Sequence, residues 1–214
     1  MRLSVSEIVY SIQGESLYAG LPCAFVRLSG CNLRCRYCDT TYAYENGTPM
    51  ALEDIIRALQ AYQCSLIEVT GGEPLLQPET PRLITELLNR GCTVLLETNG
   101  TFDIQVVDSR CARIMDVKCP GSGEAGKTDF SNFNHLGPKD QIKFVLTDRK
   151  DYDYARRMLL DRWPDGPPVA VLFSPAVGWL DPAACAAWIL KDHLPVRLQI
   201  QLHKILWPAV ERGV

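Results

Sequence analysis

Apolar runs of strand length alternate with amphipathic segments along most of this sequence. Each apolar run ends in polar residues or in Gly and Pro, which is typical of β-strands. We expect strands at AFVRLSG (24–30), LIEVTGG (66–72), TVLLETNG (93–100), RIMDVKCP (113–120), QIKFVLT (141–147), PVAVLFS (168–174) and VRLQIQL (196–202). Apolar residues at helical spacing predict helices within 52–62, 80–91, 153–163 and 181–193. This alternation predicts a mainly parallel α/β sheet, covered on both faces or curved toward a barrel.

Two of the expected helices have recognisable ends, and one crossover lacks a helix. Gly91 stops the second helix, while Asp181 suits the N-cap of the fourth, with Pro182 at its first helical position. The Gly-rich segment CPGSGEAGKTDFSNFN (119–134) predicts a loop in place of a helical crossover. Because helices are few, we expect an abbreviated βα barrel.

The length of the chain and its charge balance exclude several classes of protein. Its 214 residues suffice for one domain, 1–214, with a sizeable core. A net charge of −3, from 22 basic and 25 acidic side chains, disfavours a nucleic-acid-binding domain. No apolar run approaches the roughly 20 residues of a membrane span, and MRLSVSEIVYS is unlike a secretion signal. We therefore expect neither a nucleic-acid nor a membrane partner.

Cysteine usage points to a reducing compartment. Nine cysteines without an export signal favour the cytoplasm over a disulfide framework. Six are scattered singly, and we expect these to be packed as small hydrophobic residues: Cys23, Cys64, Cys92, Cys111, Cys119 and Cys185. The other three lie together in SGCNLRCRYCDTTYA (29–43), the cysteine loop, as Cys31, Cys35 and Cys38.

Three thiolates in one short loop indicate a metal site that the loop alone does not complete. Thiolates suit zinc and iron–sulfur clusters, which normally take four protein ligands in structural sites. In a zinc site, Cys23, Cys119 or a histidine would supply the fourth ligand. In a cluster, one iron would stay open to bind a small molecule. The C-x3-C-x2-C spacing by itself is compatible with both.

Polar segments follow most of the predicted strands, namely VTGGEP, LETNG, DVKCP, LFSPA and QLHK. In parallel α/β folds, binding sites gather at the carboxyl ends of strands. Together with the cysteine loop, these segments predict a single site built from six separated parts of the chain.

The cysteine loop and VTGGEPLLQP (69–78) resemble two motifs of radical S-adenosylmethionine (SAM) enzymes. CNLRCRYC has an aromatic residue before its last cysteine, and GGEP follows on the next strand. The resemblance implies a partial TIM-like βα barrel of the radical SAM type. It also implies that Cys31, Cys35 and Cys38 ligate a 4Fe–4S cluster whose fourth iron binds SAM. One electron from the cluster would cleave SAM to a 5′-deoxyadenosyl radical.

A longer segment, IVYSIQGESLYAGLPCAFVRLSGCNLRCRYCDTTYA (8–43), closely resembles the N-terminus of the 7-carboxy-7-deazaguanine synthases. ETNG (97–100), DVKCP (116–120) and QLHKILWP (201–208) extend the resemblance along nearly the whole chain. The family consists of radical SAM lyases of queuosine and 7-deazapurine biosynthesis. The resemblance implies conversion of 6-carboxy-5,6,7,8-tetrahydropterin to 7-carboxy-7-deazaguanine with release of ammonia. It further implies a Mg2+ ion, a homodimer and an electron donor such as flavodoxin.

The resemblance also assigns roles to individual residues. It implies substrate contacts from Ile12, Gln13, Gly14, Glu15, Ser16, Arg27, Thr70, His203 and Pro208. It implies SAM contacts from Tyr37, Cys38, Asp39, Gly72, Glu73, Asp116, Val117, Lys118, Ser174, Pro175, Ala176 and Val177. Arg27 would pair with the substrate carboxylate, which its planar fork suits. Thr40 aligns with the Mg2+ ligand, and its hydroxyl oxygen suits a hard cation.

Simpler roles exist for several of these residues. Arg27 could pair with a carboxylate for structure alone, Thr40 could make a turn hydrogen bond, and His203 could be a satisfied, partly buried histidine. A glycyl-radical-enzyme activating protein would use the same cluster and SAM, whereas a zinc- or cluster-binding interaction module would not be an enzyme. Arg27 and YSIQGES favour a small carboxylated substrate. One departure from the family is the tail 209–214 after Pro208, where relatives often end.

Overall fold

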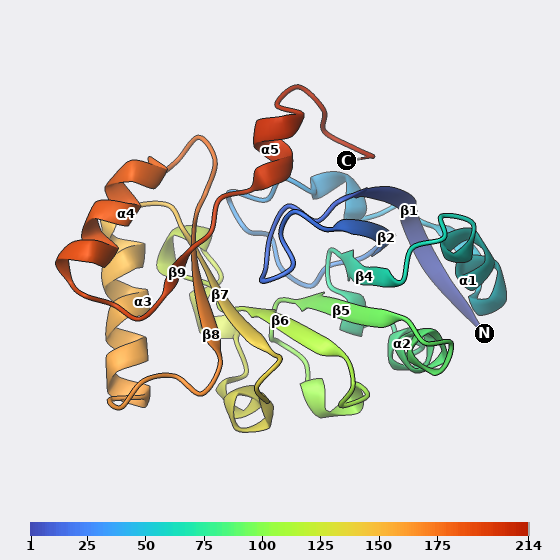
Figure 1. The fold of residues 1–214 in the computed structure, drawn as a ribbon, viewed down its shortest axis with the longest axis horizontal. Coiled ribbons are helices and arrows are strands. Elements are labelled where there is room, and N and C mark those ends of the chain that lie inside the picture. Colours follow the sequence, from blue (N-terminus) through green and yellow to red (C-terminus); the bar gives the residue numbers. More distant parts are fainter. Residues whose placement is uncertain (214) are drawn as a thin grey trace.

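The computed structural model describes residues 1–213 and shows one twisted sheet with helices on its outer side (Figure 1). Within these residues the sheet has nine strands in the order β3-β1-β2-β4-β5-β6-β7-β8-β9. The strands are β1 (Arg2–Ile12), β2 (Pro22–Leu28), β3 (Thr48–Ala51), β4 (Leu66–Gly71), β5 (Thr93–Thr98), β6 (Ala112–Asp116), β7 (Gln141–Leu146), β8 (Ala170–Pro175) and β9 (Arg197–Leu198). Val214 lies outside the described residues.

The parallel part of the sheet runs in chain order. Each strand from β2 through β4 to β9 pairs in parallel with the next, while β1 is antiparallel to both β2 and β3. A sheet whose parallel strands follow one another in sequence is the arrangement of a βα barrel. Among the described residues β3 and β9 lie at opposite edges, so the predicted α/β fold with an abbreviated barrel is confirmed.

Helices cover the outer side of this sheet in two groups (Figure 1). The helices are α1 (Leu52–Gln60), α2 (Thr80–Asn89), α3 (Arg149–Arg162), α4 (Pro182–Lys191) and α5 (Leu202–Leu206). Helices α1 and α2 bury Ile55, Ile56 and Leu83 in one core with β1, β2, β4 and β5. Helices α3 and α4 bury Tyr152 and Ile189 in a second core with β6, β7 and β8. The four outer helices therefore fix the curvature that brings the carboxyl ends of the strands together.

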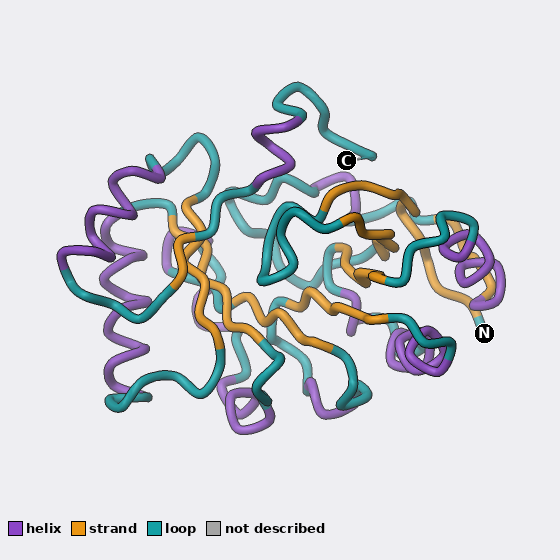
Figure 2. Tube along the Cα trace, in the orientation of Figure 1, coloured by secondary structure: helices purple, strands orange, loops and turns teal. Residues whose placement is uncertain are grey.

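The middle crossovers are irregular and not helical, as predicted for the one that contains the Gly-rich segment 119–134 (Figure 2). Only 3-10 turns connect β5 to β7: η3 (Ile104–Val106), η4 (Pro120–Ser122), η5 (Ala125–Lys127) and η6 (Phe130–His135). The predicted helix ends are also present. Gly91 has a φ of +83°, and the Asp181 side chain accepts a hydrogen bond from the Ala183 N–H at 3.0 Å.

Two parts of the sheet differ from the sequence prediction. The strands β1 and β3 were not predicted, since the pattern of 2–12 is only partly alternating and 48–51 is short. The predicted strand 196–202 pairs only at Arg197–Leu198. Beyond Leu198 the Gln199 N–H still donates to the Phe173 carbonyl at 2.9 Å, while the Gln199 and Gln201 side chains both donate to Glu15.

The scattered cysteines pack as predicted. Cys23, Cys111, Cys119 and Cys185 are fully buried, while Cys64 and Cys92 are partly buried against the first core. No helix among residues 1–213 is long and apolar enough to cross a membrane.

Candidate active site

A cavity of about 480 Å³ opens at the carboxyl ends of the parallel strands. Most of the residues assigned from the resemblance line this one cavity: Ile12, Gln13, Gly14, Glu15, Arg27, Cys31, Cys35, Tyr37, Cys38, Asp39, Thr40, Thr70, Gly72, Asp116, Lys118, Ser174, Pro175, Ala176, Val177, His203 and Pro208. The predicted convergence of separated polar segments at one site is therefore present. Two parts of the cavity lining differ in chemistry. We call the part with Cys31, Cys35 and Cys38 the cysteine side, and the part with Gln13, Glu15 and Arg27 the polar side.

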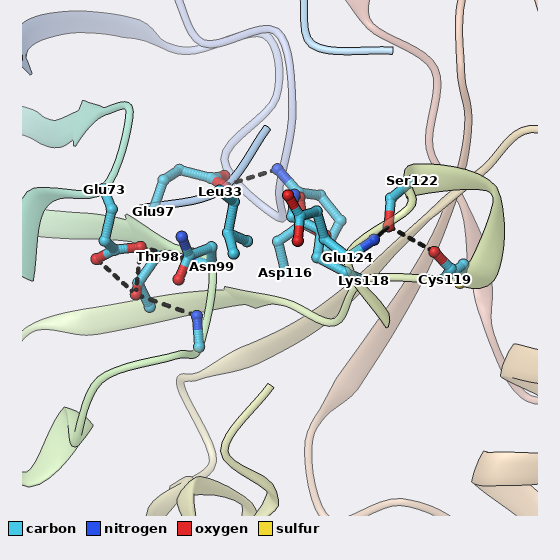
Figure 3. A network of polar contacts seen from close by, with 12 residues as sticks. Leu33, Glu73, Glu97, Thr98, Asn99, Asp116, Lys118, Cys119, Ser122 and Glu124 are labelled. Atoms are coloured by element: carbon cyan, nitrogen blue, oxygen red, sulfur yellow. Dashed lines mark hydrogen bonds and ion pairs between the residues drawn. The ribbon is translucent and has the colours of Figure 1, made fainter. Parts of the chain in front are cut away.

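Backbone contacts hold the cysteine loop in shape. The Gly30 N–H donates to the Ala43 carbonyl at 2.8 Å, which closes the loop upon itself. The neighbouring turn η4 and its continuation support the loop from outside, because Glu124 accepts from the Arg34 N–H at 2.7 Å and Ser122 from the Arg36 N–H at 3.1 Å (Figure 3 shows Ser122 and Glu124). The three thiols thus have a fixed frame although the loop has no regular secondary structure.

Glycines of the GGEP segment allow β4 to approach this loop closely. A Cβ on Gly71 would overlap the Leu28 carbonyl oxygen, and one on Gly72 would overlap the Gly30 carbonyl oxygen and lie 2.6 Å from the Cys31 Cβ. Only glycine leaves room for such backbone contact. The GGEP segment and the cysteine loop, which follow one another in the sequence, are therefore also in direct contact in the structure.

Glu73 is not a cavity residue, contrary to the expectation from the motif. Its side chain is fully buried and accepts hydrogen bonds from the Leu75 N–H at 2.9 Å, the Thr98 hydroxyl at 2.9 Å and the Asn99 N–H at 2.6 Å (Figure 3). The Asn99 amide in turn donates to the Asn32 side chain at 3.0 Å. The carboxylate therefore ties the ends of β4 and β5 to the cysteine loop.

Besides Glu73, Ser16 does not line the cavity, and neither does Val117. Its side chain is fully buried in the second core, and its N–H donates to the Lys143 carbonyl at 2.8 Å. Its neighbours Asp116 and Lys118 do line the cavity and form an ion pair at 2.7 Å. Alternation along an extended segment explains this, because successive side chains point to opposite faces.

The cysteine side fits a cluster that needs thiolate ligands. Cys31, Cys35 and Cys38 are partly exposed at the cavity wall, and burial raises the pKa of the Cys35 thiol to about 11. A raised pKa means that forming the thiolate costs free energy. Iron replaces the thiol proton when it binds, so the metal–sulfur bond would offset this cost. Within residues 1–213, no three His, Cys, Asp or Glu side chains are grouped so that they could hold a single metal ion.

One of the residues expected to contact SAM, Asp116, has a carboxylate oxygen without a hydrogen-bond partner among the described residues. The Oδ2 atom of Asp116 accepts from Lys118, whereas its buried Oδ1 atom has no hydrogen-bond partner among the described residues. A buried acceptor without a partner is costly, and a hydroxyl or amino group of a ligand in the cavity would satisfy it. This part of the cavity thus fits a cofactor that carries hydrogen-bond donors, such as SAM.

The polar side is dominated by buried charges. Lys143 on β7 lies 3.1 Å from a Glu15 oxygen and 2.7 Å from a Glu97 oxygen, and Glu68 accepts a hydrogen bond from the Gln13 amide. We call Glu15, Glu68, Glu97 and Lys143 the acid cluster. All four line the cavity, so one ammonium group faces three carboxyl groups there.

The pKa values within the acid cluster diverge. Burial raises the pKa of Glu97 to about 7, and burial together with Glu97 raises the pKa of Glu68 well above its ordinary value. Burial would also raise the pKa of Glu15, but Lys143 and Gln201 lower it to about 2. Burial lowers the pKa of Lys143, yet Glu15 and Glu97 together raise it above the ordinary value. The cavity therefore holds both an ionised and a protonated carboxyl group near neutral pH.

Helix α5 closes the polar side. The Leu202 N–H donates to the Gly14 carbonyl at 2.9 Å, and a Cβ on Gly14 would overlap the His203 ring. Burial lowers the pKa of His203, which keeps its imidazole neutral at pH 7. Across the mouth, the Thr40 hydroxyl donates to Asp39 at 2.9 Å, and Lys204 lies 3.5 Å from the same carboxylate.

Sequence reasoning missed Glu68, Glu97 and Lys143. Each is a single charged residue within an otherwise apolar strand run. Lys and Glu are rarely fully buried without a partner, and perturbed buried groups in a cleft are typical of functional sites. A lone charge in a predicted buried strand could therefore have identified them.

Comparisons with known proteins agree with this geometry. Residues 25–119 match the radical SAM superfamily. The chain is 45% identical to the 7-carboxy-7-deazaguanine synthase of Chlorobaculum tepidum, covering 99% of this chain and 97% of the relative. It is 40% identical to that of Koribacter versatilis, covering 99% of this chain and all of the relative.

Solved structures support the fold independently of close sequence similarity. The crystal structure of QueE from Escherichia coli superposes with a TM-score of 0.77 at 21% identity, covering 95% of each chain. The structure of Streptococcus suis SuiB bound to S-adenosylmethionine reaches 0.56 at 14% identity, covering 79% of this chain and 48% of SuiB. With the sequence similarity over nearly the full length, the conclusion is plain: this chain belongs to the 7-carboxy-7-deazaguanine synthase family of radical SAM enzymes.

Proposed function

We propose that this chain converts 6-carboxy-5,6,7,8-tetrahydropterin to 7-carboxy-7-deazaguanine and ammonia, a step of queuosine biosynthesis. One observation carries the proposal: a single cavity is lined both by three cysteines and by Arg27, Thr70 and the acid cluster. Arg27 and Thr70 are directly paired on β2 and β4, so both side chains project from the same face. The cavity can thus hold a cofactor and a small polar, carboxylated substrate side by side.

The residues would divide the work as follows. Cys31, Cys35 and Cys38 would hold the 4Fe–4S cluster, and Asp116 and Lys118 would contact SAM. When bound, the cluster and SAM supply a carbon-centred radical that can remove a hydrogen atom from the pterin. Arg27 would orient the substrate carboxylate, for which its fork geometry is suited.

The acid cluster would recognise the ring of the substrate. Its ionised Glu15 accepts hydrogen bonds, whereas a protonated Glu68 or Glu97 can also donate one, so together they match a ring edge that carries both donors and acceptors. Helix α5 and the segment after it would then exclude water, since His203 and Pro208 line the same cavity. The protein's task is positioning, and the cofactor supplies the difficult chemistry.

The proposal is tested by turnover of the reconstituted protein. Purified chain with iron, sulfide, SAM, Mg2+ and a strong reductant should consume 6-carboxytetrahydropterin and release 7-carboxy-7-deazaguanine. Formation of 5′-deoxyadenosine without that product, at saturating substrate, would reject the substrate assignment while leaving the radical SAM assignment in place. A glycyl-radical-enzyme activating protein would instead require a polypeptide substrate and leave the pterin unchanged.

We infer a Mg2+ site at Thr40 beside the substrate carboxylate. The Thr40 hydroxyl lines the cavity and is bonded only to the neighbouring Asp39 among the described residues, so it is accessible to a cation. Hard cations prefer such oxygen ligands. Thr40→Ala should raise the Mg2+ concentration for half-maximal activity without changing the iron content, and Thr41→Ala is the matched control. An unchanged Mg2+ titration would reject the role.

We further infer that the chain is one domain that acts in the cytoplasm as a homodimer and receives its electron from a flavodoxin-like donor. The single sheet and the cysteine usage support the first two points, and family membership supports the last two. Analytical ultracentrifugation of the holoprotein tests the dimer. Turnover with reduced flavodoxin in place of a chemical reductant tests the donor.

A further inference from the structure

A β-bulge in β1 decides which residue stands beside Arg27. Val5 pairs with Leu28, but Glu7 pairs with Arg27, so β1 has one residue more than β2 across this step. In a regular ladder Glu7 would stand opposite Val26, whose side chain is fully buried in the first core. The extra residue turns Glu7 to the opposite face, where Arg27 lies. Bulges of this kind often re-aim a side chain next to a site.

Glu7 then uses one oxygen for two contacts. Its Oε1 atom accepts from the Arg27 Nε at 2.8 Å and from the Tyr42 hydroxyl at 2.8 Å. The Glu7 and Arg27 side chains are only 13% and 18% exposed, so this pair is largely shielded from water. Burial would raise the pKa of Glu7, but Arg27 and Tyr42 lower it, which keeps the carboxylate ionised. Charge-assisted bonds of this type are stronger than neutral ones.

The hydrogen bond to Nε leaves the two terminal amino groups of the Arg27 guanidinium available for a ligand. The two terminal amino groups make no hydrogen bond to any described residue, and Arg27 lines the cavity. Those two groups are the ones that bind a carboxylate side by side. The Glu7 bond to Nε therefore fixes the plane of the guanidinium and leaves its two terminal amino groups free to meet a ligand.

The second contact reaches the turn that carries Thr40. Tyr42 lies in η1 (Thr41–Ala43), which begins immediately after Thr40. One Glu7 oxygen thus connects β2, which carries Arg27, to the turn at the end of the cysteine loop. The C-terminal tail covers this connection, since the Arg212 guanidinium lies 4.1 Å from the centre of the Tyr42 ring.

We propose that Glu7 is a positioning residue for substrate-carboxylate recognition, which sets Arg27 and the Thr40 turn at the spacing that one carboxylate group requires. The proposal rests on the proposed function, because it takes Arg27 as the group that meets the substrate carboxylate. Glu7 itself does not line the cavity, so it acts through Arg27 and Tyr42.

Fluorescent oxidised pterins test this without turnover. Holoprotein with SAM, but without reductant, is titrated with 6-carboxypterin and with pterin, which lacks the carboxylate. Glu7→Ala should weaken 6-carboxypterin binding about tenfold, the cost of a lost charge-assisted bond, and leave pterin binding unchanged. Tyr42→Phe, which keeps the ring beneath Arg212, should weaken it about threefold, because it removes one of the two bonds to the Glu7 carboxylate and leaves the bond to Arg27 in place. Glu7→Gln, which keeps an acceptor oxygen, should fall between wild type and Glu7→Ala.

Each outcome has a distinct meaning. Glu53→Ala removes an exposed partner of Arg90 and serves as the matched control. Equal loss of both ligands in Glu7→Ala and Glu7→Gln would reduce Glu7 to a structural role and overturn the proposal. If Arg27→Ala lowers the affinity for 6-carboxypterin but Glu7→Ala does not, the positioning role fails while the proposed function stands. If Arg27→Ala has no effect either, the proposed substrate-carboxylate contact itself fails.

Discussion

The cysteine side and the polar side of the cavity are built in different ways. The cysteine loop is a continuous stretch of chain, held by backbone hydrogen bonds and by glycines that permit close contact. The acid cluster comes from four separate segments. Lys143 holds Glu15 and Glu97 by ion pairs, and the Gln13 amide donates a hydrogen bond to Glu68. Under the proposed function, cofactor binding would therefore depend on local motifs, whereas substrate recognition would depend on how the whole sheet is packed.

The largest expected effect lies on the cysteine side and concerns function. Cys35→Ala removes one of the three proposed thiol ligands, so the reconstituted protein should lose its cluster absorbance and all 5′-deoxyadenosine formation. Stability of the iron-free protein should barely change, because Cys35 is only partly buried. Iron analysis and urea unfolding measure the two properties. Cys92→Ala, at a partly buried cysteine outside the cavity, should keep both iron and activity.

On the polar side the largest effect should instead concern stability. Lys143→Met leaves Glu15 and Glu97 without their shared cation, and removing one partner of a buried ion pair costs about 3–5 kcal/mol. Urea unfolding of the iron-free protein measures this loss. Lys139→Met, at an exposed lysine near the start of the same strand, is the control. A loss as small as that of Lys139→Met would mean that the acid cluster is not held together by Lys143.

The same difference explains how far the sequence could be interpreted. Cys31, Cys35 and Cys38 are neighbours in sequence, so their spacing alone predicted a shared metal site, although not which metal it holds, and the order of strands and helices followed from periodicity. Glu97 and Lys143 meet only because β5, β6 and β7 are paired in one register. No local pattern encodes that register. The bulge at Glu7 likewise disturbs the alternation of β1, which is why this strand was missed.

A smaller effect should test the contact between the two motifs. Gly72→Ala places a Cβ against the Gly30 carbonyl and Cys31, and overpacking of this kind costs about 1–3 kcal/mol. The displaced loop should also bind iron less completely. Gly126→Ala is the matched control, because a Cβ there meets nothing within 4 Å. Equal unfolding free energies for the two variants would contradict the close approach of β4 to the cysteine loop.

The smallest effect is a change in the pH dependence of stability. The folded-state pKa of Glu97 is about 7, above its ordinary value of 4.5. Its protonated form therefore stabilises the fold fully below pH 4.5, and this contribution is lost as the pH rises through about 7. The lowered pKa of Glu15 acts in the opposite sense, but its contribution changes only as the pH falls below 4.5 toward about 2.

Glu97→Gln should consequently reduce the loss of unfolding free energy between pH 5 and pH 7.5. A neutral amide mimics the protonated acid, so the variant should match wild type at pH 5 and exceed it at pH 7.5. Urea unfolding of the iron-free protein at both pH values measures this, with the exposed Glu53→Gln as control. Parallel pH profiles for wild type and variant would show that Glu97 is ionised throughout. The polar side would then carry its negative charge near neutral pH on Glu97 as well as Glu15, and a protonated donor would have to come from Glu68 alone.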